Sequence, residues 1–185
     1  MLSAPSPRVE NGDALNNETK LYDSGLDEYP WSVVISENFA LTAWISLGTA
    51  ISWELNAVIG LVYLIFSVLM ILVIMRKLVC TRCYYYGKRC HVGWGKISVL
   101  LYKQGDIDKF NSCAGIKIAP VLFASLALIP LIFGVILLIK APSITYGILM
   151  TALILFIVYS SVISRKRSCS ICKMKLICPG GSIAR

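Results

Sequence analysis

Three long runs of uncharged, mostly apolar residues dominate the pattern along the chain. They cover residues 57–75, 118–139 and 144–164. A helix needs about 20 apolar residues to cross the hydrocarbon core of a bilayer, and each run has about that length. The pattern therefore predicts three transmembrane helices. The short connection from Lys140 to Ser143 predicts that the second and third form a tight antiparallel hairpin.

A fourth uncharged run, residues 38–53, is shorter than a spanning helix requires. Thr42, Ser46 and Thr49 recur along it at helical spacing, so one face of a helix there would carry hydroxyl groups. Trp44 favours the headgroup region of a membrane. We therefore expect an amphipathic helix that lies in the interface or spans half of the membrane. A short fourth span is the alternative.

Composition agrees with an all-α integral membrane protein. Hydrophobic residues make up 57% of the 185-residue chain and charged residues 15%, whereas a soluble domain carries about 25% charged residues. The charges are also segregated, with a net charge of −5 over residues 1–38, +7 over 76–117 and +6 over 164–185. Blocks of charge that flank apolar runs are typical of membrane topology. We therefore interpret the formal net charge of +8 as topology and not as nucleic-acid binding.

The lysine and arginine counts predict which segments face the cytoplasm. The loop after the first predicted transmembrane helix holds nine and the C-terminal tail six, while the N-terminal arm holds two and the hairpin turn one. Because cytoplasmic loops are enriched in these residues, we expect the loop and the tail in the cytoplasm, and the arm and the hairpin turn outside. A fourth span at 38–53 would move only the arm to the cytoplasmic side. The arm, residues 1–30, lacks the apolar stretch of a signal peptide, so we expect a transmembrane helix to direct insertion.

All seven cysteines lie in the basic loop and the basic tail, and six of them repeat one pattern. The first and third predicted helices run in the same direction, so their ends should emerge side by side at one membrane depth. Each copy of the pattern begins at one of these ends. The first copy is Arg76-Lys77-x-x-Cys80-x-x-Cys83, followed by Cys90, and the second is Arg165-Lys166-x-x-Cys169-x-x-Cys172, followed by Cys178.

Two Cys-x-x-Cys turns are a common framework for a tetrahedral metal site with four thiolate ligands. We predict one such site for zinc or an iron–sulfur cluster, because both accept four thiolates. The alternatives are inert thiols, disulfides and palmitoylation. Cys113 stands apart and is expected to be a packed thiol. The candidate ligands are Cys80, Cys83, Cys169 and Cys172, with Cys90, His91 and Cys178 as further ligands or as a second site.

The basic loop also holds an aromatic stretch, residues 84–96. Tyrosine and tryptophan beside a membrane end favour the headgroups, and lysine and arginine attract anionic lipid. We therefore expect this stretch at the inner leaflet, with a short helix over 94–102. Nucleic acid is not an expected partner.

The sequence thus divides into six segments. They are a flexible acidic arm (1–30), an interfacial or half-spanning helix (31–56), a transmembrane helix (57–76), a basic cysteine-rich inner loop (77–117), a transmembrane hairpin (118–164) and a basic cysteine-rich inner tail (165–185).

The function that these features favour is that of a small accessory or scaffold subunit of a membrane complex. The cysteines would ligate a metal on the cytoplasmic face, and the partners would be the bilayer, anionic lipid, other membrane subunits or further copies of the chain. No Ser–His–acid set points to an enzyme. A membrane-bound redox or electron-transfer protein is the first alternative. An oligomeric transporter or channel is the second, and it is disfavoured because the three predicted spans contain no ionisable residue.

Overall fold

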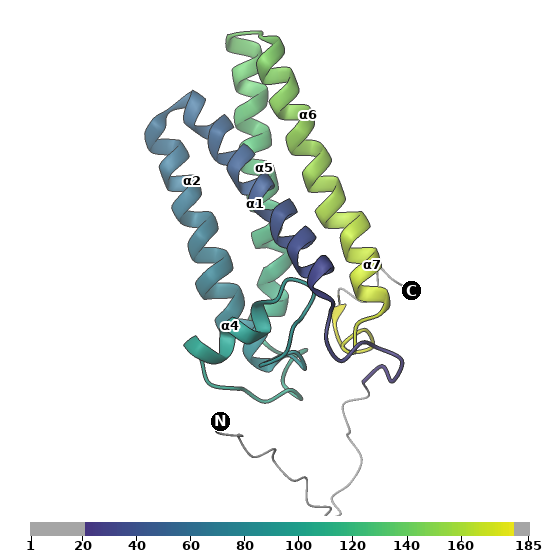
Figure 1. The fold of residues 1–185 in the computed structure, drawn as a ribbon. Coiled ribbons are helices and arrows are strands. Elements are labelled where there is room, and N and C mark those ends of the chain that lie inside the picture. Colours follow the sequence, from purple (N-terminus) through teal and green to yellow (C-terminus); the bar gives the residue numbers. More distant parts are fainter. Residues whose placement is uncertain (1–20, 180–185) are drawn as a thin grey trace, which may run out of the picture.

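A computed structural model describes residues 21–179, and their regular structure is helical throughout (Figure 1). No strand occurs in this range, where the one strand-like pairing is an isolated bridge between Leu26 and Cys172. The all-helical architecture expected from the sequence is therefore confirmed for this range. Four helices are long and apolar enough to cross a membrane, namely Trp31–Leu55, Ala57–Arg82, Ala114–Lys140 and Ile144–Ser170.

Two of these four helices are divided into segments near their ends. The first and third are single helices, α1 (Trp31–Leu55) and α5 (Ala114–Lys140). The second comprises α2 (Ala57–Leu69), the π-helical η1 (Met70–Met75), α3 (Arg76–Leu78) and the 3-10 helix η2 (Cys80–Arg82). The fourth comprises α6 (Ile144–Val158), the π-helical η3 (Tyr159–Ser164) and α7 (Arg165–Ser170). The short helix predicted in the aromatic stretch is confirmed as α4 (Trp94–Leu101).

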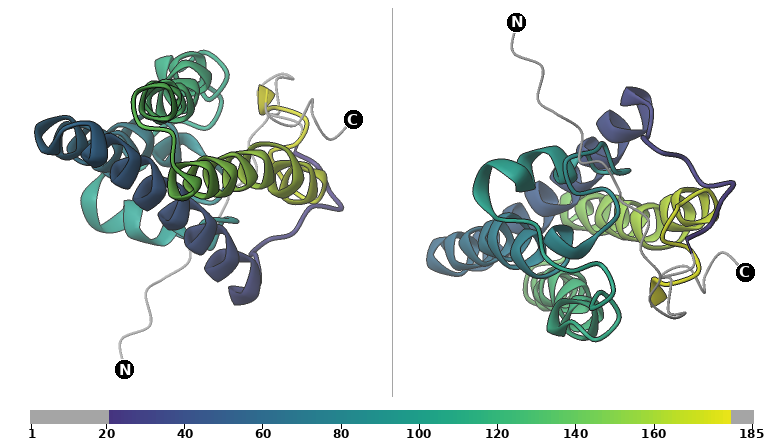
Figure 2. Two further views of the ribbon diagram at one scale, coloured as in Figure 1. Left: turned by 90° about the horizontal axis from the view of Figure 1, so that it is seen from above. Right: turned by 90° about the horizontal axis from the view of Figure 1, so that it is seen from below.

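The first helix differs most from the sequence prediction of an interfacial or half-spanning segment. α1 has 25 residues, which at 1.5 Å per residue makes it about 37 Å long, more than the ~30 Å of a hydrocarbon core. It packs against α2, α5 and α6, and it crosses the bundle obliquely (Figure 2). Its buried residues include Ala40, Trp44, Gly48 and Ile51, which recur at helical spacing. α1 is therefore a central element of the bundle.

A single residue turns the chain from α1 into α2. Asn56 is extended, with φ of −166°, and its side-chain oxygen accepts a hydrogen bond from the Val58 amide at 2.8 Å. Gly60 then lets the two helices approach closely, because a Cβ atom there would lie 2.8 Å from the Cα of Trp53. The Asn56 cap makes a one-residue turn sufficient, although the sequence offers little room between the two apolar runs.

The predicted hairpin of the last two spans is present as α5 and α6. Ser143 caps α6 by accepting a hydrogen bond from the Thr145 amide at 3.3 Å. α5 begins at Ala114, four residues before the predicted start. Pro120 therefore lies inside the helix and not in its first turn, and the helix continues through both Pro120 and Pro130. The prediction placed the start too late because Lys117 interrupts the uncharged run.

Many large apolar side chains on the outer faces of the helices are exposed. Examples are Val58, Val62, Val121, Ile132 and Leu155, each at least half exposed. A soluble protein would seldom leave such a continuous apolar surface uncovered. This surface is the one that lipid would cover if the four helices span a membrane.

The described part of the N-terminal arm, residues 21–30, packs at the same end of the bundle as the cysteine-rich loop and tail (Figure 1). The Leu26 amide donates to the carbonyl oxygen of Ile171 at 2.9 Å, and the Tyr29 amide donates to that of Arg89 at 3.0 Å. This corrects the prediction that the arm lies opposite the loop and the tail. The physical reason is the length of α1, which carries the chain along the whole bundle. Residues 1–20 of the predicted arm lie outside the described range.

Candidate functional site at the cysteine-rich end of the bundle

The repeated cysteine pattern is also a repeated local structure. Each copy begins directly after a π-helical segment at the end of a long helix; Cys80 then starts the 3-10 helix η2, and Cys169 lies inside α7. In each, the amide of the second cysteine donates to the carbonyl of the first, at 3.4 Å for Cys83 with Cys80 and for Cys172 with Cys169. In each, the amide three residues further on donates to the carbonyl of the second cysteine at 3.0 Å. The two Cys-x-x-Cys turns therefore share the same two backbone hydrogen bonds.

The six repeated cysteines form two groups of three. We call Cys80, Cys83 and Cys90 the loop triad, and Cys169, Cys172 and Cys178 the tail triad. Cys83 lies within electrostatic range of both other members of the loop triad and of Cys172. Cys169 likewise lies within range of both other members of the tail triad. The structure thus brings the triads together at one end of the bundle, with Cys83 and Cys172 at their junction.

The triads do not form an assembled metal centre in this structure. All seven cysteines are free, and within residues 21–179 no three side chains of His, Cys, Asp or Glu gather closely enough to hold one ion. The donor chemistry fits zinc or an iron–sulfur cluster, since the triads offer six thiols. The placement of the six sulfurs does not fit such a metal site, because a shared ion would require the sulfurs to lie closer together.

Burial determines the protonation of the thiols at the junction. It raises the pKa of Cys83, and the neighbouring Cys80, Cys90 and Cys172 raise it further. Burial also raises the pKa of Cys172. Both groups are therefore neutral thiols at neutral pH. They lack the lowered pKa that activates a nucleophilic or redox cysteine.

The two other residues singled out from the sequence occupy different surroundings. His91 packs edge-on against Tyr29, with 6.0 Å between ring centroids. Its pKa is lowered to about 4 by burial and by the charge of Arg165, so the imidazole is neutral, as a metal ligand must be. Cys113 is buried directly before α5 and outside both triads, in agreement with its interpretation as a packed thiol.

Backbone and tyrosine contacts of the arm hold the loop and the tail together. Leu26 lies between them: its amide bonds to Ile171 of the tail, and its carbonyl accepts a hydrogen bond from the Tyr85 hydroxyl of the loop at 2.6 Å. The same Tyr85 oxygen accepts from the Lys173 amide at 3.2 Å. Tyr29 is buried and donates from its hydroxyl to the carbonyl of Ser168 at 2.6 Å. The arm therefore connects both copies of the cysteine pattern.

Acidic side chains of the arm pair with basic side chains of the loop and tail. Glu28 forms a salt bridge with Arg89 at 2.7 Å, and hydrogen bonding from Arg89 lowers the pKa of Glu28. Asp27 accepts a hydrogen bond from the Tyr84 hydroxyl at 2.7 Å and lies 3.4 Å from the ammonium of Lys173, and both contacts lower its pKa. These pairs were not predicted from the sequence, although the opposite net charges of the segments indicate them.

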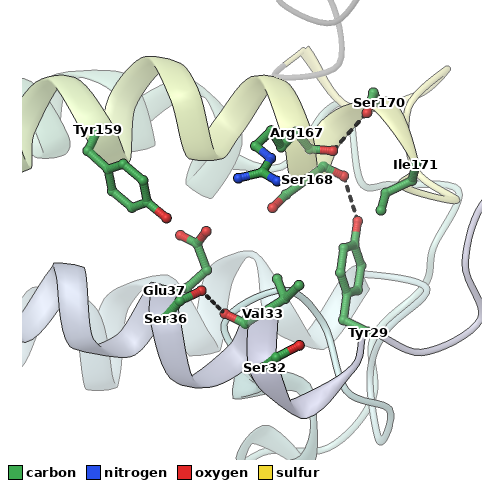
Figure 3. A pocket seen from close by; sticks show the side chains of 10 residues that line it. All are labelled: Tyr29, Ser32, Val33, Ser36, Glu37, Tyr159, Arg167, Ser168, Ser170 and Ile171. Carbon is green, nitrogen blue, oxygen red and sulfur yellow. Dashed lines mark hydrogen bonds between the residues drawn. The ribbon is translucent and has the colours of Figure 1, made fainter.

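A cavity of about 490 Å³ lies beside the triads, between the start of α1 and the end of the fourth long helix (Figure 3). Its lining includes Glu37, Tyr159 and Arg167. The Glu37 carboxylate and the Tyr159 hydroxyl point toward each other, and the Arg167 guanidinium lies close by (Figure 3). Glu37 accepts a short hydrogen bond from Ser164. This site was not predicted from the sequence, because Glu37 stands there only as one charge of the acidic block over residues 1–38.

The cysteine-rich end can therefore act in two ways: its thiols can bind a soft metal if they draw together, and its cavity can bind a small polar group. Neither possibility is supported by a known relative. A comparison of the chain with protein-family models, curated proteins and solved structures finds no match.

Proposed function

We propose that all four long helices span the membrane. Two acids support α1 as a span. The stretch from Glu37 to Glu54 corresponds to about 25 Å along a helix, and the run between them is uncharged. Glu37 accepts a hydrogen bond from Ser164, and Glu54 accepts one from the Tyr146 hydroxyl at 3.2 Å. Each acid thus has a hydroxyl partner on the fourth helix, which reduces the cost of placing it near a membrane surface.

Four spans give a consistent orientation. The arm, the loop and the tail would share one side of the membrane, and only the two short hairpin turns would face the other. The first side would then hold every lysine and arginine except Lys140. Because positive residues favour the cytoplasm, we place both ends of the chain and all the cysteines there. This is a stronger bias than the three-span arrangement gives.

Within this topology, the function that the geometry supports best is that of an accessory or scaffold subunit. The cysteine-rich face would be fixed by a thiolate-bound metal, either zinc or an iron–sulfur cluster. The duplicated Cys-x-x-Cys turn carries the proposal, because both copies follow parallel helix ends and meet at Cys83 and Cys172. The arm keeps the two copies adjacent. Metal binding would have to contract the triads, and it would then stabilise the folded state.

Two measurements on protein purified in detergent without chelators test this proposal, namely elemental analysis and the visible absorption spectrum. Bound zinc without colour favours a scaffold, whereas iron with sulfide favours the electron-transfer alternative. Cys83→Ser and Cys172→Ser should each lower the metal content, and the double variant should lose little more, because the two residues act in one site. Cys113→Ser is the matched control and should keep its metal. Protein free of both zinc and iron, or unchanged metal in Cys83→Ser and Cys172→Ser, would exclude the proposed site.

A further inference from the structure

The cavity beside α1 combines satisfied and unsatisfied polar groups. The hydroxyl of Ser36 donates to the carbonyl of Val33 at 2.9 Å, and that of Ser170 donates to the carbonyl of Arg167 at 2.7 Å. By contrast, the Tyr159 hydroxyl and the Arg167 guanidinium have no partner among residues 21–179. The Tyr159 hydroxyl and the Arg167 guanidinium lie near the Glu37 carboxylate in one part of the cavity (Figure 3).

The available groups have opposite charges that do not neutralise each other. Glu37 and Arg167 line the same cavity, yet no salt bridge joins them in the described part of the chain. One oxygen of the Glu37 carboxylate accepts from Ser164, and the other remains as an acceptor. The cavity therefore offers an anionic acceptor beside a cationic donor, with the Tyr159 hydroxyl near both. A ligand that carries an ammonium and an anion on one short chain would match both charges.

The position of the cavity indicates where such a ligand would come from. Its walls are the first turns of α1 and the segment from Tyr159 to Ile171. Trp31 begins α1 and is exposed, as is typical of a side chain at the headgroups, and three basic residues, 165–167, mark the end of the membrane-spanning part of the fourth helix. In the four-span arrangement the cavity therefore lies at the depth of the cytoplasmic headgroups. Its volume of about 490 Å³ is also within the range of small-ligand sites.

We propose that this cavity binds a zwitterion composed of a phosphate and a primary ammonium, the headgroup of phosphatidylethanolamine being its membrane source. The ammonium would donate to Glu37, and the phosphate would accept from Arg167 and from the Tyr159 hydroxyl. The inference rests on the membrane placement proposed above and is independent of the metal. Its failure would therefore leave the metal proposal intact, and a topology experiment would test the membrane placement separately.

The chemistry of the site predicts a definite order of affinity. A choline headgroup carries the same charges but has no N–H to donate to Glu37. A glycerol headgroup has the phosphate but no cation. A charge-assisted hydrogen bond contributes about 1.5–3 kcal/mol, so phosphatidylethanolamine should bind roughly ten- to a hundredfold more tightly than phosphatidylcholine. Phosphatidylglycerol should bind through its phosphate alone.

The experiment uses full-length protein, delipidated in detergent and titrated with the three lipids at matched acyl chains. Binding is measured by native mass spectrometry and by the thermal unfolding midpoint. Glu37→Gln should abolish the preference for phosphatidylethanolamine, while the Gln carbonyl can still accept from Ser164. Arg167→Gln should weaken phosphatidylethanolamine and phosphatidylglycerol alike. Lys166→Gln is the matched control, because it removes the same charge from an exposed residue that lies outside the cavity.

A second arm of the experiment replaces the lipid with free phosphoethanolamine. Stabilisation by both would identify a soluble zwitterion as a ligand, whereas stabilisation by the lipid alone would identify the membrane as the source. Either result supports the proposed chemistry. Equal binding of the three lipids without any effect of free phosphoethanolamine would overturn it. Should Glu37→Gln fold poorly, Tyr159→Phe and Arg167→Gln test the phosphate contacts instead. Unchanged affinity in both of these variants would also overturn the proposal.

Discussion

Gly48, near the middle of α1, provides a sharp test of the packing that makes this helix central to the bundle. It is buried and faces Tyr63 of α2. A Cβ atom at Gly48 would lie 2.7 Å from the Tyr63 hydroxyl oxygen and 2.9 Å from two ring carbons, whereas ordinary contacts begin at 3.4 Å. The ring cannot move freely, because its hydroxyl donates to the carbonyl of Leu126 on α5 at 2.9 Å. Gly48→Ala therefore strains a contact that connects three helices.

The expected change in the free energy of unfolding of Gly48→Ala is the sum of two costs and one gain. Overpacking of a buried contact costs about 1–3 kcal/mol, and a weakened Tyr63–Leu126 hydrogen bond costs about 0.5–1.5 kcal/mol more. Replacing glycine with alanine inside a helix returns about 1 kcal/mol. The net effect should be a destabilisation of about 0.5–3.5 kcal/mol, measured as a lower midpoint of thermal unfolding in detergent. Gly147→Ala is the matched control, because nothing lies within 4 Å of its added methyl group, and it should be neutral or stabilising.

A double variant separates this contact from a general effect on α1. Tyr63→Phe removes the hydroxyl that approaches Gly48 most closely. The combination of Gly48→Ala with Tyr63→Phe should therefore cost less than the sum of the two single changes. If Gly48→Ala behaves like Gly147→Ala, then α1 does not pack against α2 as described, and the case for a central first helix fails.

Two further predictions concern the attachment of the arm. Tyr29→Phe leaves the Ser168 carbonyl without the 2.6 Å hydrogen bond and should lower the unfolding midpoint by an amount equivalent to about 1–3 kcal/mol. Tyr22→Phe is the control and should leave the midpoint unchanged, because the Tyr22 hydroxyl has no partner among residues 21–179. Equal midpoints for the two variants would contradict this prediction. The lowered pKa values of Asp27 and Glu28 predict that their stabilising pairs are complete above the ordinary values of 3.8 and 4.5 and are lost as the pH falls through the lowered ones. Hydrogen-exchange protection of the arm amides should therefore fall in acid, and constant protection from roughly pH 7 to roughly pH 3 would refute the role of these pairs.

The three longest helices were predictable because each depends on a local property, an uncharged apolar run of about 20 residues. The first helix was not, because Glu37 and Glu54 confine its uncharged run to the stretch 38–53. These acids are tolerated through hydrogen bonds to Ser164 and Tyr146, which are 127 and 92 positions away in the sequence. No local pattern reports such partners.

The cysteine-rich end shows the same division between local and long-range information. The spacing of Cys80 and Cys83 predicted a turn, and its repetition at Cys169 and Cys172 predicted a second one at the same end of the bundle. The sequence could not show that Leu26 would pass between the two copies. It also could not predict the cavity at Glu37, whose walls come from segments far apart in the sequence.

The membrane topology of the arm tests the central claim, that four helices span the membrane, most directly. Single cysteines placed at Ser24 and at Ser143, both of them exposed positions, can be challenged in intact cells with a membrane-impermeant maleimide. The protein that carries only its native cysteines, labelled in parallel before and after permeabilisation, gives the background. The four-span arrangement predicts that Ser143→Cys reacts in intact cells and that Ser24→Cys reacts only after the membrane is permeabilised. Labelling of both Ser24→Cys and Ser143→Cys in intact cells would place the two positions on the same side of the membrane, so that α1 could not cross it, and would contradict the account.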